Sequence, residues 1–354
     1  MRKIVAVIPA YNPENLLIEY INKLISEGFD KLIIVNDGSA AECEPVFDQV
    51  KSIPQCTLLV HPENRGKGRA LKTAFRYFLE NTEYESYYGV VTADADGQHS
   101  PKDTRAVADA IAAGGRKNNF VLGCRDFDSE NVPFKSKKGN KITRAVMHLL
   151  FSKRITDTQT GLRGLNRKFI RECLKLGGER FEYEINMLIV GMRTQNIVEV
   201  PIETIYFNQN RASSFKAVKD SVRIYSVILA SFFKFLFSSL SSAIIDILLF
   251  NVFVGMVFGN TDVSKAIFFS TILARIISSM YNYFVNRKMV FKSNSGAISV
   301  VKYYTLVLII MLLSAVIVTG FYRITNFNKS VIKIIVDSLL FVLSYKAQQL
   351  WVFK

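Results

Sequence analysis

Two carboxylates stand two positions apart in the triplet Asp94-Ala95-Asp96, which directly follows an apolar stretch over residues 88–93. At this spacing both can reach one hard divalent cation, which binds through one or two carboxylates, several waters and substrate phosphates. Gln98 adds a neutral oxygen two residues further on. A diphosphate leaving group needs such a cation, because negative charge builds on it as its bond breaks. The triplet therefore indicates a site for Mg²⁺ or Mn²⁺, although Asp-x-Asp also occurs in ordinary turns.

Composition divides the 354 residues into two halves. Charged residues, Gly and Pro are mixed up to about Tyr225, as in a soluble domain, and long apolar runs dominate from Phe232 onward. No signal peptide precedes the first apolar strand, so we expect the first half to be cytoplasmic. Its cysteines lack metal-ligand spacing, which indicates free thiols in a reducing compartment. They are Cys43, Cys56, Cys124 and Cys173.

The formal net charge of +15 agrees with two kinds of partner. A nucleic-acid-binding protein would also be basic. Much of the charge here flanks the apolar runs, however, and basic segments beside a membrane are attracted to anionic lipid. The charge therefore favours a membrane surface and not nucleic acid.

Short apolar runs alternate with segments of helical periodicity in the first half. The expected strands cover residues 4–8, 31–35, 57–60, 88–92 and 120–123, and helices are expected over residues 14–27 and 68–80. This order predicts an α/β fold with a mostly parallel sheet. Ligands bind beyond the carboxyl ends of such strands, so the segments 9–11, 36–39 and 94–96 should converge on one crevice.

Four segments together resemble family 2 glycosyltransferases, with the order and spacing of the polyprenyl-phosphate branch that includes dolichyl-phosphate mannose synthase. They are Val7–Asn12, Val35–Ser39, Asn64–Gly68 and Asp94–His99, and Asp157–Arg163 also resembles that branch. The match covers most of residues 1 to about 225 and implies a GT-A-type, Rossmann-like nucleotide-sugar domain. Pro13 is a departure, because many members have Glu directly after Asn; Glu14 is assigned in its place.

The resemblance implies a donor site for a nucleoside-diphosphate sugar, UDP- or GDP-hexose. Asp37 would read the nucleotide base, since a carboxylate accepts hydrogen bonds from an imide or amine edge; an Asx-turn before Gly38 is the plainer alternative. Lys67, in its glycine-flanked loop, would approach a phosphate. The expected donor-binding residues are Pro9, Tyr11, Glu14, Asp37, Lys67, Ala95, Gln98 and Arg125, and the expected metal ligands are Asp94, Asp96 and Gln98.

The acceptor implied by the resemblance is a polyprenyl phosphate. A phosphomonoester is already mostly dianionic near neutral pH, because its second pKa is about 6, so the enzyme mainly needs cationic positioning. The expected acceptor-binding residues are Arg125, Lys138, Arg211, Ser213 and Ser214, with Lys138 in a loop that also carries Lys135 and Lys137.

Three further acidic residues have open roles. Asp157 joins Asp94 and Asp96 as an expected catalytic residue that orients the sugar or acts as a base, unless it is a structural turn residue. Glu182 and Glu184 hold the sugar or the Asp94–Asp96 loop, or else they cap the start of a helix.

Four apolar segments in the second half are each long enough to span a bilayer, at about 20 residues. They cover residues 235–258, 266–285, 303–322 and 332–352. This half resembles the GtrA-like family, and the segment 283–291 is echoed by 348–353. Because basic loops stay on the cytoplasmic side of a membrane, we expect the basic loop over residues 286–302 and both termini to be cytoplasmic.

Charges within these segments are costly and usually face the bundle interior. Asp246, Arg275 and Asp337 are such charges. They have either a functional role or a structural one, as ion pairs that only fix helix packing.

The predicted organisation is a cytoplasmic glycosyltransferase domain over residues 1–210, an interfacial helix over 211–231, and an all-α, four-helix transmembrane domain over 232–354. The resemblance implies inverting transfer of a hexose to undecaprenyl or dolichyl phosphate at the cytoplasmic membrane face, which gives a lipid-linked sugar for the cell envelope. A flippase for lipid-linked sugar is an alternative from another class. A processive polysaccharide synthase is a third, but the chain lacks the Gln-x-x-Arg-Trp motif, since its one Trp is Trp351. The sugar, the nucleotide, the prenol length and a homo-oligomeric state stay open.

Overall fold

The computed structural model describes residues 2–114, 119–127, 134–151, 153–203, 217–257, 262–291, 293, 295–325 and 327–353. The chain forms two compact units, Met1–Ile228 and Leu229–Lys354. Three of the predicted acceptor ligands, Arg211, Ser213 and Ser214, lie outside the described residues.

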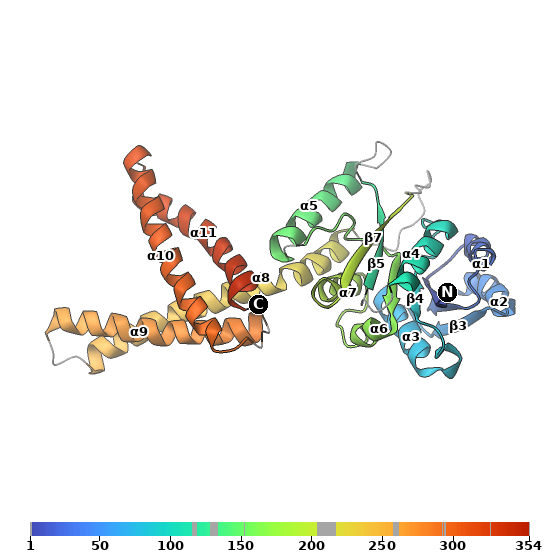
Figure 1. Ribbon diagram of the computed structural model, residues 1–354, viewed down its shortest axis with the longest axis horizontal. Coiled ribbons are helices and arrows are strands. Elements are labelled where there is room, and N and C mark those ends of the chain that lie inside the picture. The colour runs from blue at the N-terminus through green and yellow to red at the C-terminus, as the bar shows by residue number, and fades with distance from the viewer. Residues whose placement is uncertain are drawn as a thin grey trace. The chain divides into compact units, whose positions relative to one another are not determined.

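The first unit is built on a sheet that has seven strands in the described part of the chain, in the order β3-β2-β1-β4-β6-β5-β7 (Figure 1). The strands are β1 Ile4–Ala10, β2 Leu32–Asp37, β3 Cys56–His61, β4 Gly89–Thr92, β5 Asn119–Arg125, β6 Arg163–Asn166 and β7 Asn196–Ile202. Neighbouring strands are parallel except that β6 runs antiparallel to β4 and β5. The predicted α/β fold with a mostly parallel sheet is confirmed.

Helices cover both faces of this sheet. Alternate residues of β1 point to opposite faces, as in any strand, and Ala6 and Ile8 pack with buried residues of α1, α2 and α4. The helices α3, α6 and α7 contact one another and form the second layer. The helical bounds are α1 Leu16–Ser26, α2 Glu44–Ser52, α3 Lys67–Glu80, α4 Pro101–Ala113, α5 Phe134–Phe151, α6 Arg167–Cys173 and α7 Glu182–Thr194.

The carboxyl ends of the parallel strands lie at one edge of the sheet, and the amino end of β6 joins them there because Thr92 pairs with Arg163. Two loops at this edge are tied together by hydrogen bonds. Ser39 Oγ accepts from the Asn12 amide at 2.9 Å, and Asn12 Oδ1 accepts from the Ala40 amide at 2.9 Å. The loops after β1 and β2 therefore converge, as the sequence predicts.

The segment with Lys135, Lys137 and Lys138 was expected to be a loop, and this expectation is wrong: it forms the start of α5. Among the α5 residues whose burial is described, the buried ones include two polar residues, Asn140 and Thr143, besides Met147 and Leu150. A helix is predicted from apolar residues at helical spacing. Here an amide and a hydroxyl take two of the buried positions, so the apolar spacing is incomplete in the sequence.

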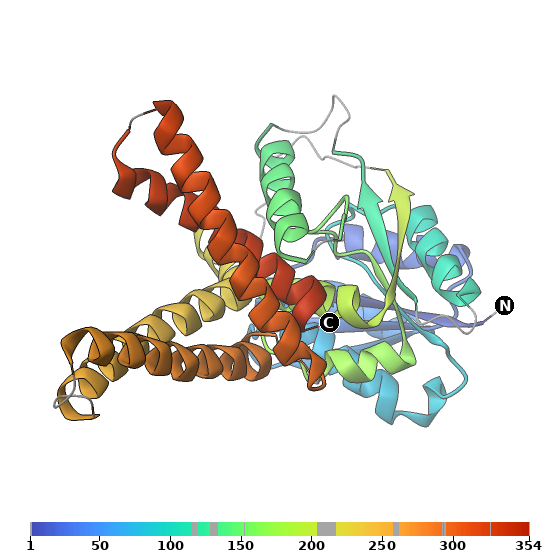
Figure 2. The ribbon, with the colours of Figure 1, turned by 60° about the vertical axis from the view of Figure 1, so that its left-hand side comes forward.

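The second unit is all-α, as predicted, and contains most of α8 (Ala217–Val252), followed by α9 (Val263–Val285), α10 (Ile298–Thr325) and α11 (Lys329–Ala347). The yellow α8 and the orange α9 lie side by side in Figure 2. A hydrogen bond joins these two helices, in which Ser242 Oγ donates to the Ser278 carbonyl at 2.8 Å. Among the described residues, three helices are long and apolar enough to cross a membrane: Asp220–Val257, Val263–Val290 and Ile298–Thr325. The fourth predicted span forms α11, which carries Lys333, Asp337 and Lys346 within 19 residues. Four spans therefore stay a prediction.

The helix α8 differs in extent from the predicted one. An interfacial helix was expected over residues 211–231, before the first span, but residues 217–252 form one uninterrupted helix. Its first turns belong to the first unit, where Ile224 and Ile228 are buried.

The two echoing sequence segments adopt the same local structure. Asn286–Val290 and Gln348–Val352 are both single π-helical turns, which directly follow α9 and α11. They contact each other: Asn286 Nδ2 donates to Gln348 Oε1 at 3.0 Å, and the rings of Phe291 and Phe353 stack at 5.2 Å. The sequence echo is therefore a structural repeat.

Candidate active site

Asp94 and Asp96 lie directly after β4, at the edge of the sheet where the strand ends meet. The Gln98 amide donates to Asp96 Oδ1 at 3.1 Å across Gly97, which has a φ of +74°. This short turn leaves Asp96 and Gln98 exposed and Asp94 partly buried.

Lys67 connects this loop to a second carboxylate. Its Nζ lies 2.6 Å from Asp94 Oδ1 and 3.0 Å from Glu184 Oε1. Lys67 is the first residue of α3, and Glu184 lies in the first turn of α7. Burial lowers the pKa of Lys67, but the charges of Asp94 and Glu184 outweigh it and hold that pKa above its ordinary value.

Gly66 lets the start of α3 approach the chain before α7. Its φ of +100° is a conformation that favours glycine, and a Cβ atom there would lie 2.5 Å from the Glu179 carbonyl oxygen. The Arg69 amide donates to the same Glu179 carbonyl at 2.9 Å. This close approach brings Lys67 within reach of Glu184.

Two groups border the other oxygen of Asp94. His99 Nε2 lies 3.5 Å from Asp94 Oδ2, and a Cβ atom at Gly161 would lie 2.4 Å from the same oxygen. Thr92 Oγ1 fixes this part of the chain by donating to the Gly161 carbonyl at 2.8 Å. Burial raises the pKa of Asp94, but Lys67 and His99 lower it by more. The pKa of this carboxyl therefore lies well below its usual range, and the group stays ionised.

The charges of this loop suit a divalent cation. Although Asp96 reaches the surface, the protein around its carboxyl removes part of its hydration and raises its pKa, and the neighbouring charge of Asp94 raises that pKa further because the two carboxylates repel each other. A hard cation relieves that repulsion, and two carboxylates with the Gln98 amide oxygen are suitable ligands for it. Among the described residues no group of three or more His, Cys, Asp and Glu side chains is arranged to hold a metal alone. Substrate phosphate oxygens would have to complete the set.

Asp37 has an internal role at the end of β2. Its Oδ1 lies 2.7 Å from His61 Nδ1 and accepts from the Arg65 amide at 3.0 Å, while its Oδ2 accepts from the Gly66 amide at 2.7 Å. The carboxylate thus organises the loop that leads into α3. Reading of the base by Asp37 stays a prediction.

Arg125 and Asp157 form a second charged pair at the same edge. Arg125 Nε and Nη2 donate to the two oxygens of Asp157 at 2.7 and 3.2 Å. The Gln159 amide donates to Asp157 Oδ1 at 3.0 Å. Asp157 is completely buried, whereas the Arg125 side chain is 20% exposed. The arrangement fixes the guanidinium of Arg125 and leaves Asp157 without access to solvent.

Comparison with known proteins identifies both halves of the chain. The description Glycosyl transferase family 2 matches residues 5–174, and GtrA/DPMS, transmembrane domain, matches residues 234–353. The chain combines a family 2 glycosyltransferase domain with a GtrA/DPMS transmembrane domain.

Three relatives of the glycosyltransferase domain are 27–30% identical to this chain over the aligned residues. A UDP-N-acetylglucosamine–dolichyl-phosphate N-acetylglucosaminyltransferase of Methanococcus voltae is 29% identical over 225 residues, which are 58% of this chain and 87% of the relative. A dolichyl-phosphate beta-glucosyltransferase of Trichomonas vaginalis is 30% identical over 220 residues, 56% of this chain and 64% of the relative. An uncharacterized protein of Methanocaldococcus jannaschii is 27% identical over 236 residues, 65% of this chain and 93% of the relative.

The other predicted residues of the glycosyltransferase domain lie at or near the strand ends. Pro9 is the second-last residue of β1, Tyr11 follows it with 44% exposure, and Glu14 is exposed just before α1. Ala95 separates the two carboxylates and is partly buried. Lys138 is exposed on α5, whose Asn140 Nδ2 donates to the Thr156 carbonyl at 2.9 Å, next to Asp157.

Glu182 and Glu184, whose roles were left open, make different contacts. Glu182 Oε1 accepts from the amides of Glu179 and Arg180 at 3.1 and 3.3 Å, so Glu182 caps the turn before α7. Glu184 contacts the Asp94 loop through Lys67. The contact of Glu184 with the Asp94 loop agrees with one of the alternatives, whereas capping of the helix itself and contact with the sugar stay predictions.

Three contributors to the site were not predicted: His61, His99 and Gly161. His61 lies beside Asp37, and His99 lies beside Asp94. A usable signal was their position, since His61 ends β3 and His99 follows the Asp94 loop directly.

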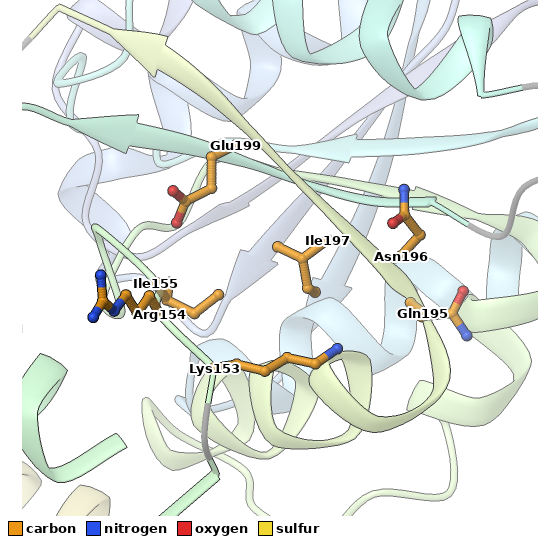
Figure 3. Close-up of a pocket in the computed structure, with 7 residues that line it drawn as sticks. All are labelled: Lys153, Arg154, Ile155, Gln195, Asn196, Ile197 and Glu199. Atoms are coloured by element: carbon orange, nitrogen blue, oxygen red, sulfur yellow. The ribbon is translucent and has the colours of Figure 1, made fainter. Parts of the chain in front are cut away.

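A groove of about 420 Å³ lies elsewhere on the domain (Figure 3). Its lining residues are Lys153, Arg154, Ile155, Gln195, Asn196, Ile197 and Glu199. None of them is a predicted site residue, and Glu199 is occupied by the Thr156 amide and hydroxyl at 2.7 and 3.1 Å.

Proposed function

We propose that the protein transfers a hexose from a nucleoside-diphosphate sugar, UDP- or GDP-linked, to polyprenyl phosphate at the cytoplasmic face of the membrane, with inversion at the anomeric carbon. The family 2 domain makes it a glycosyltransferase. The acceptor is supported by two relatives whose names specify dolichyl phosphate. The observation that carries the proposal is that the Asp94–Asp96 loop and the Arg125–Asp157 pair lie at the same edge of the sheet.

The donor half of the site would use Asp94, Asp96 and Gln98 to hold Mg²⁺ or Mn²⁺. The cation, when bound, would offset the charge that develops on the leaving diphosphate. Asp37 keeps the loop after β3 in the shape that places Lys67 beside Asp94. Pro9, Tyr11, Glu14 and Ala95 would line the remaining donor site.

The acceptor half would need positioning more than proton removal. Phosphate monoester oxygens are already ionised near neutral pH. A general base must reach the proton that it removes, and the buried Asp157 is engaged by Arg125 and the Gln159 amide. We therefore propose that Asp157 orients Arg125 toward the lipid phosphate, with Lys138, Arg211, Ser213 and Ser214 as further partners of that phosphate.

The GtrA/DPMS domain would keep the reaction at the membrane. Polyprenyl phosphate is confined to the bilayer, so an enzyme anchored beside it gains in effective concentration and orientation. We place both chain termini in the cytoplasm, on the basis of the basic loop after α9.

The test is transfer by the purified full-length protein. It would be incubated with a panel of UDP- and GDP-hexoses and with either polyprenyl phosphate or a free oligosaccharide, with Mn²⁺ or with a chelator. We expect one donor to give a phosphodiester-linked sugar lipid, only with metal, and with the anomeric configuration opposite to that of the donor. Transfer to the oligosaccharide alone would refute the acceptor, and retention of configuration would refute inversion.

A further inference from the structure

Lys67 occupies a position that the proposed metal also needs. Its ammonium lies 2.6 Å from Asp94 Oδ1, and the side chain is only 17% exposed. A divalent cation and an ammonium compete for the same carboxylate oxygen, because both are attracted to its negative charge.

Asp94 cannot easily present a different oxygen to the metal. Its Oδ2 is bordered by His99 at 3.5 Å and by the backbone of Gly161, where even a methyl group would come within 2.4 Å. Rotation of the carboxylate is therefore restricted, so a metal that binds Asp94 has to share or replace the contact with Lys67.

Glu184 provides a second partner for the released ammonium. Its Oε1 lies 3.0 Å from Lys67 Nζ, and its side chain is only 9% exposed. An ammonium has three donors, so Lys67 can keep Glu184 while it turns another N–H toward a new acceptor. The acceptor that the proposed function brings to this place is the diphosphate of the donor.

We propose that Lys67 is an internal counter-cation that holds Asp94 in the metal-free enzyme, and that metal binding transfers its ammonium from Asp94 to the donor diphosphate. The inference rests on the proposed function, since it assumes a metal at Asp94 and Asp96. Lys67 would therefore weaken the binding of the metal alone and strengthen the binding of the nucleotide diphosphate when the metal is present.

Because of this double role, removal of the Lys67 charge should change two binding affinities in opposite directions. The first is the affinity of the full-length protein for Mn²⁺ without nucleotide, by isothermal titration calorimetry. The second is the affinity for UDP or GDP at saturating Mn²⁺. Lys67→Met should bind Mn²⁺ about tenfold more tightly and the diphosphate about tenfold more weakly, each about 1.4 kcal/mol.

Two variants serve as matched controls. Lys67→Arg keeps the charge and should leave the Mn²⁺ affinity close to that of the wild type. Lys72→Met removes a positive charge from the same helix, but Lys72 pairs with Glu179 at 3.0 Å and not with Asp94. It should change neither affinity, which would separate the specific contact from the general charge of the domain.

The outcomes distinguish this inference from the proposed function. An unchanged or weaker Mn²⁺ affinity in Lys67→Met, while Asp96→Asn abolishes Mn²⁺ binding, would overturn the role of Lys67 alone. Absence of Mn²⁺ binding to the wild type would overturn the metal site itself. If Lys67→Met does not unfold cooperatively as the wild type does, Lys67→Gln takes its place, because its side chain is neutral but can still form hydrogen bonds. It should show the same tighter binding of Mn²⁺ and weaker binding of the diphosphate.

Discussion

Charged side chains make the decisive contacts at the strand ends of the glycosyltransferase unit, whereas neutral amides and hydroxyls make many of the polar contacts between the described helices of the membrane unit. Lys67 pairs with Asp94 and Glu184 in the first. In the second, Asn282 Oδ1 accepts from Tyr303 and from Asn286 at 2.8 Å each. Buried charges are expensive and cluster where chemistry requires them, so the difference locates the chemistry in the first unit.

The described part of the membrane unit also has charged contacts, and the first of them is the pair Asp246 and Arg275. Arg275 Nη2 lies 3.2 Å from Asp246 Oδ2, and Ser278 Oγ donates to Asp246 Oδ1 at 2.8 Å. Asp337 of α11 accepts across the helices from Ser314 of α10 at 2.6 Å, and it also pairs with Lys333 of its own helix at 2.8 Å. These cross-helix contacts support a packing role for the charges, the simpler of the two roles left open by the sequence.

One of the two largest predicted effects, equal to that of Asp96→Asn, comes from Gly161→Ala, which crowds the charged site without removing a charge. Gly161→Ala would place a methyl group against Asp94 Oδ2, where the added Cβ has no room. We expect sugar transfer to fall by at least about a hundredfold, because an active-site carboxylate moved by a fraction of an ångström misplaces its ligand. Gly139→Ala is the control, since nothing lies within 4 Å of a Cβ there. Equal activity of the two variants would contradict this close packing.

A somewhat smaller effect is predicted for Asp157→Asn. It removes the charge that holds Arg125 and should raise the Michaelis constant for polyprenyl phosphate about tenfold or more, since hydrogen bonds to charged groups contribute about 1.5–3 kcal/mol. Kinetics with each substrate varied in turn would measure this. Asp48→Asn, which breaks an exposed ion pair with Lys51, should have no effect. A change confined to the donor constant would assign Arg125 to the nucleotide instead.

Substitutions at the neutral contacts of the membrane unit should lower the stability of the protein and leave metal binding at the active site unchanged. Asn286 is fully buried and donates to both Asn282 and Gln348. We expect Asn286→Leu to lower the free energy of unfolding by about 1–3 kcal/mol, because its partners lose their hydrogen bonds. Mn²⁺ affinity should stay unchanged. A loss of Mn²⁺ binding in a folded variant would break the division between the two units.

The smallest effect is predicted for Asp246→Asn, which keeps the shape and most hydrogen bonds of the pair with Arg275. Transfer to polyprenyl phosphate should stay within about twofold of the wild type, as for most substitutions away from a site. Reconstituted vesicles with acceptor on the outer face would show this. Abolished transport of the product across the bilayer, with normal transfer, would instead favour the flippase alternative.

Local patterns explain which parts of the first unit were predictable. Strands β1 to β5 are apolar runs, and most of them end at motifs rich in Pro, Gly or Asp, so their order and their carboxyl ends followed from the sequence. The strand β6 did not, because Arg163-Gly164-Leu165-Asn166 is four residues long, is buried throughout and includes an arginine. Its antiparallel direction depends on pairing with β4 and β5, which no local pattern records.

The site was predictable in its motifs but not in its contacts. Asp94, Asp96 and Gln98 lie where their spacing placed them. The contact of Lys67 with Glu184 joins α3 to α7, elements far apart in the chain, and it depends on the close approach at Gly66. A sequence shows that such residues exist, and only the packing of the helices shows which of them meet.

The central claim is that the paired carboxylates after β4 drive sugar transfer through a metal. The most direct measurement compares wild type and Asp96→Asn in the transfer of sugar to polyprenyl phosphate at saturating Mn²⁺, with thermal unfolding to verify that both fold. We predict that the variant folds as the wild type does and loses at least about a hundredfold in rate, since a bound cation contributes several kcal/mol of charge stabilisation. Undiminished transfer by a folded Asp96→Asn protein would contradict the account.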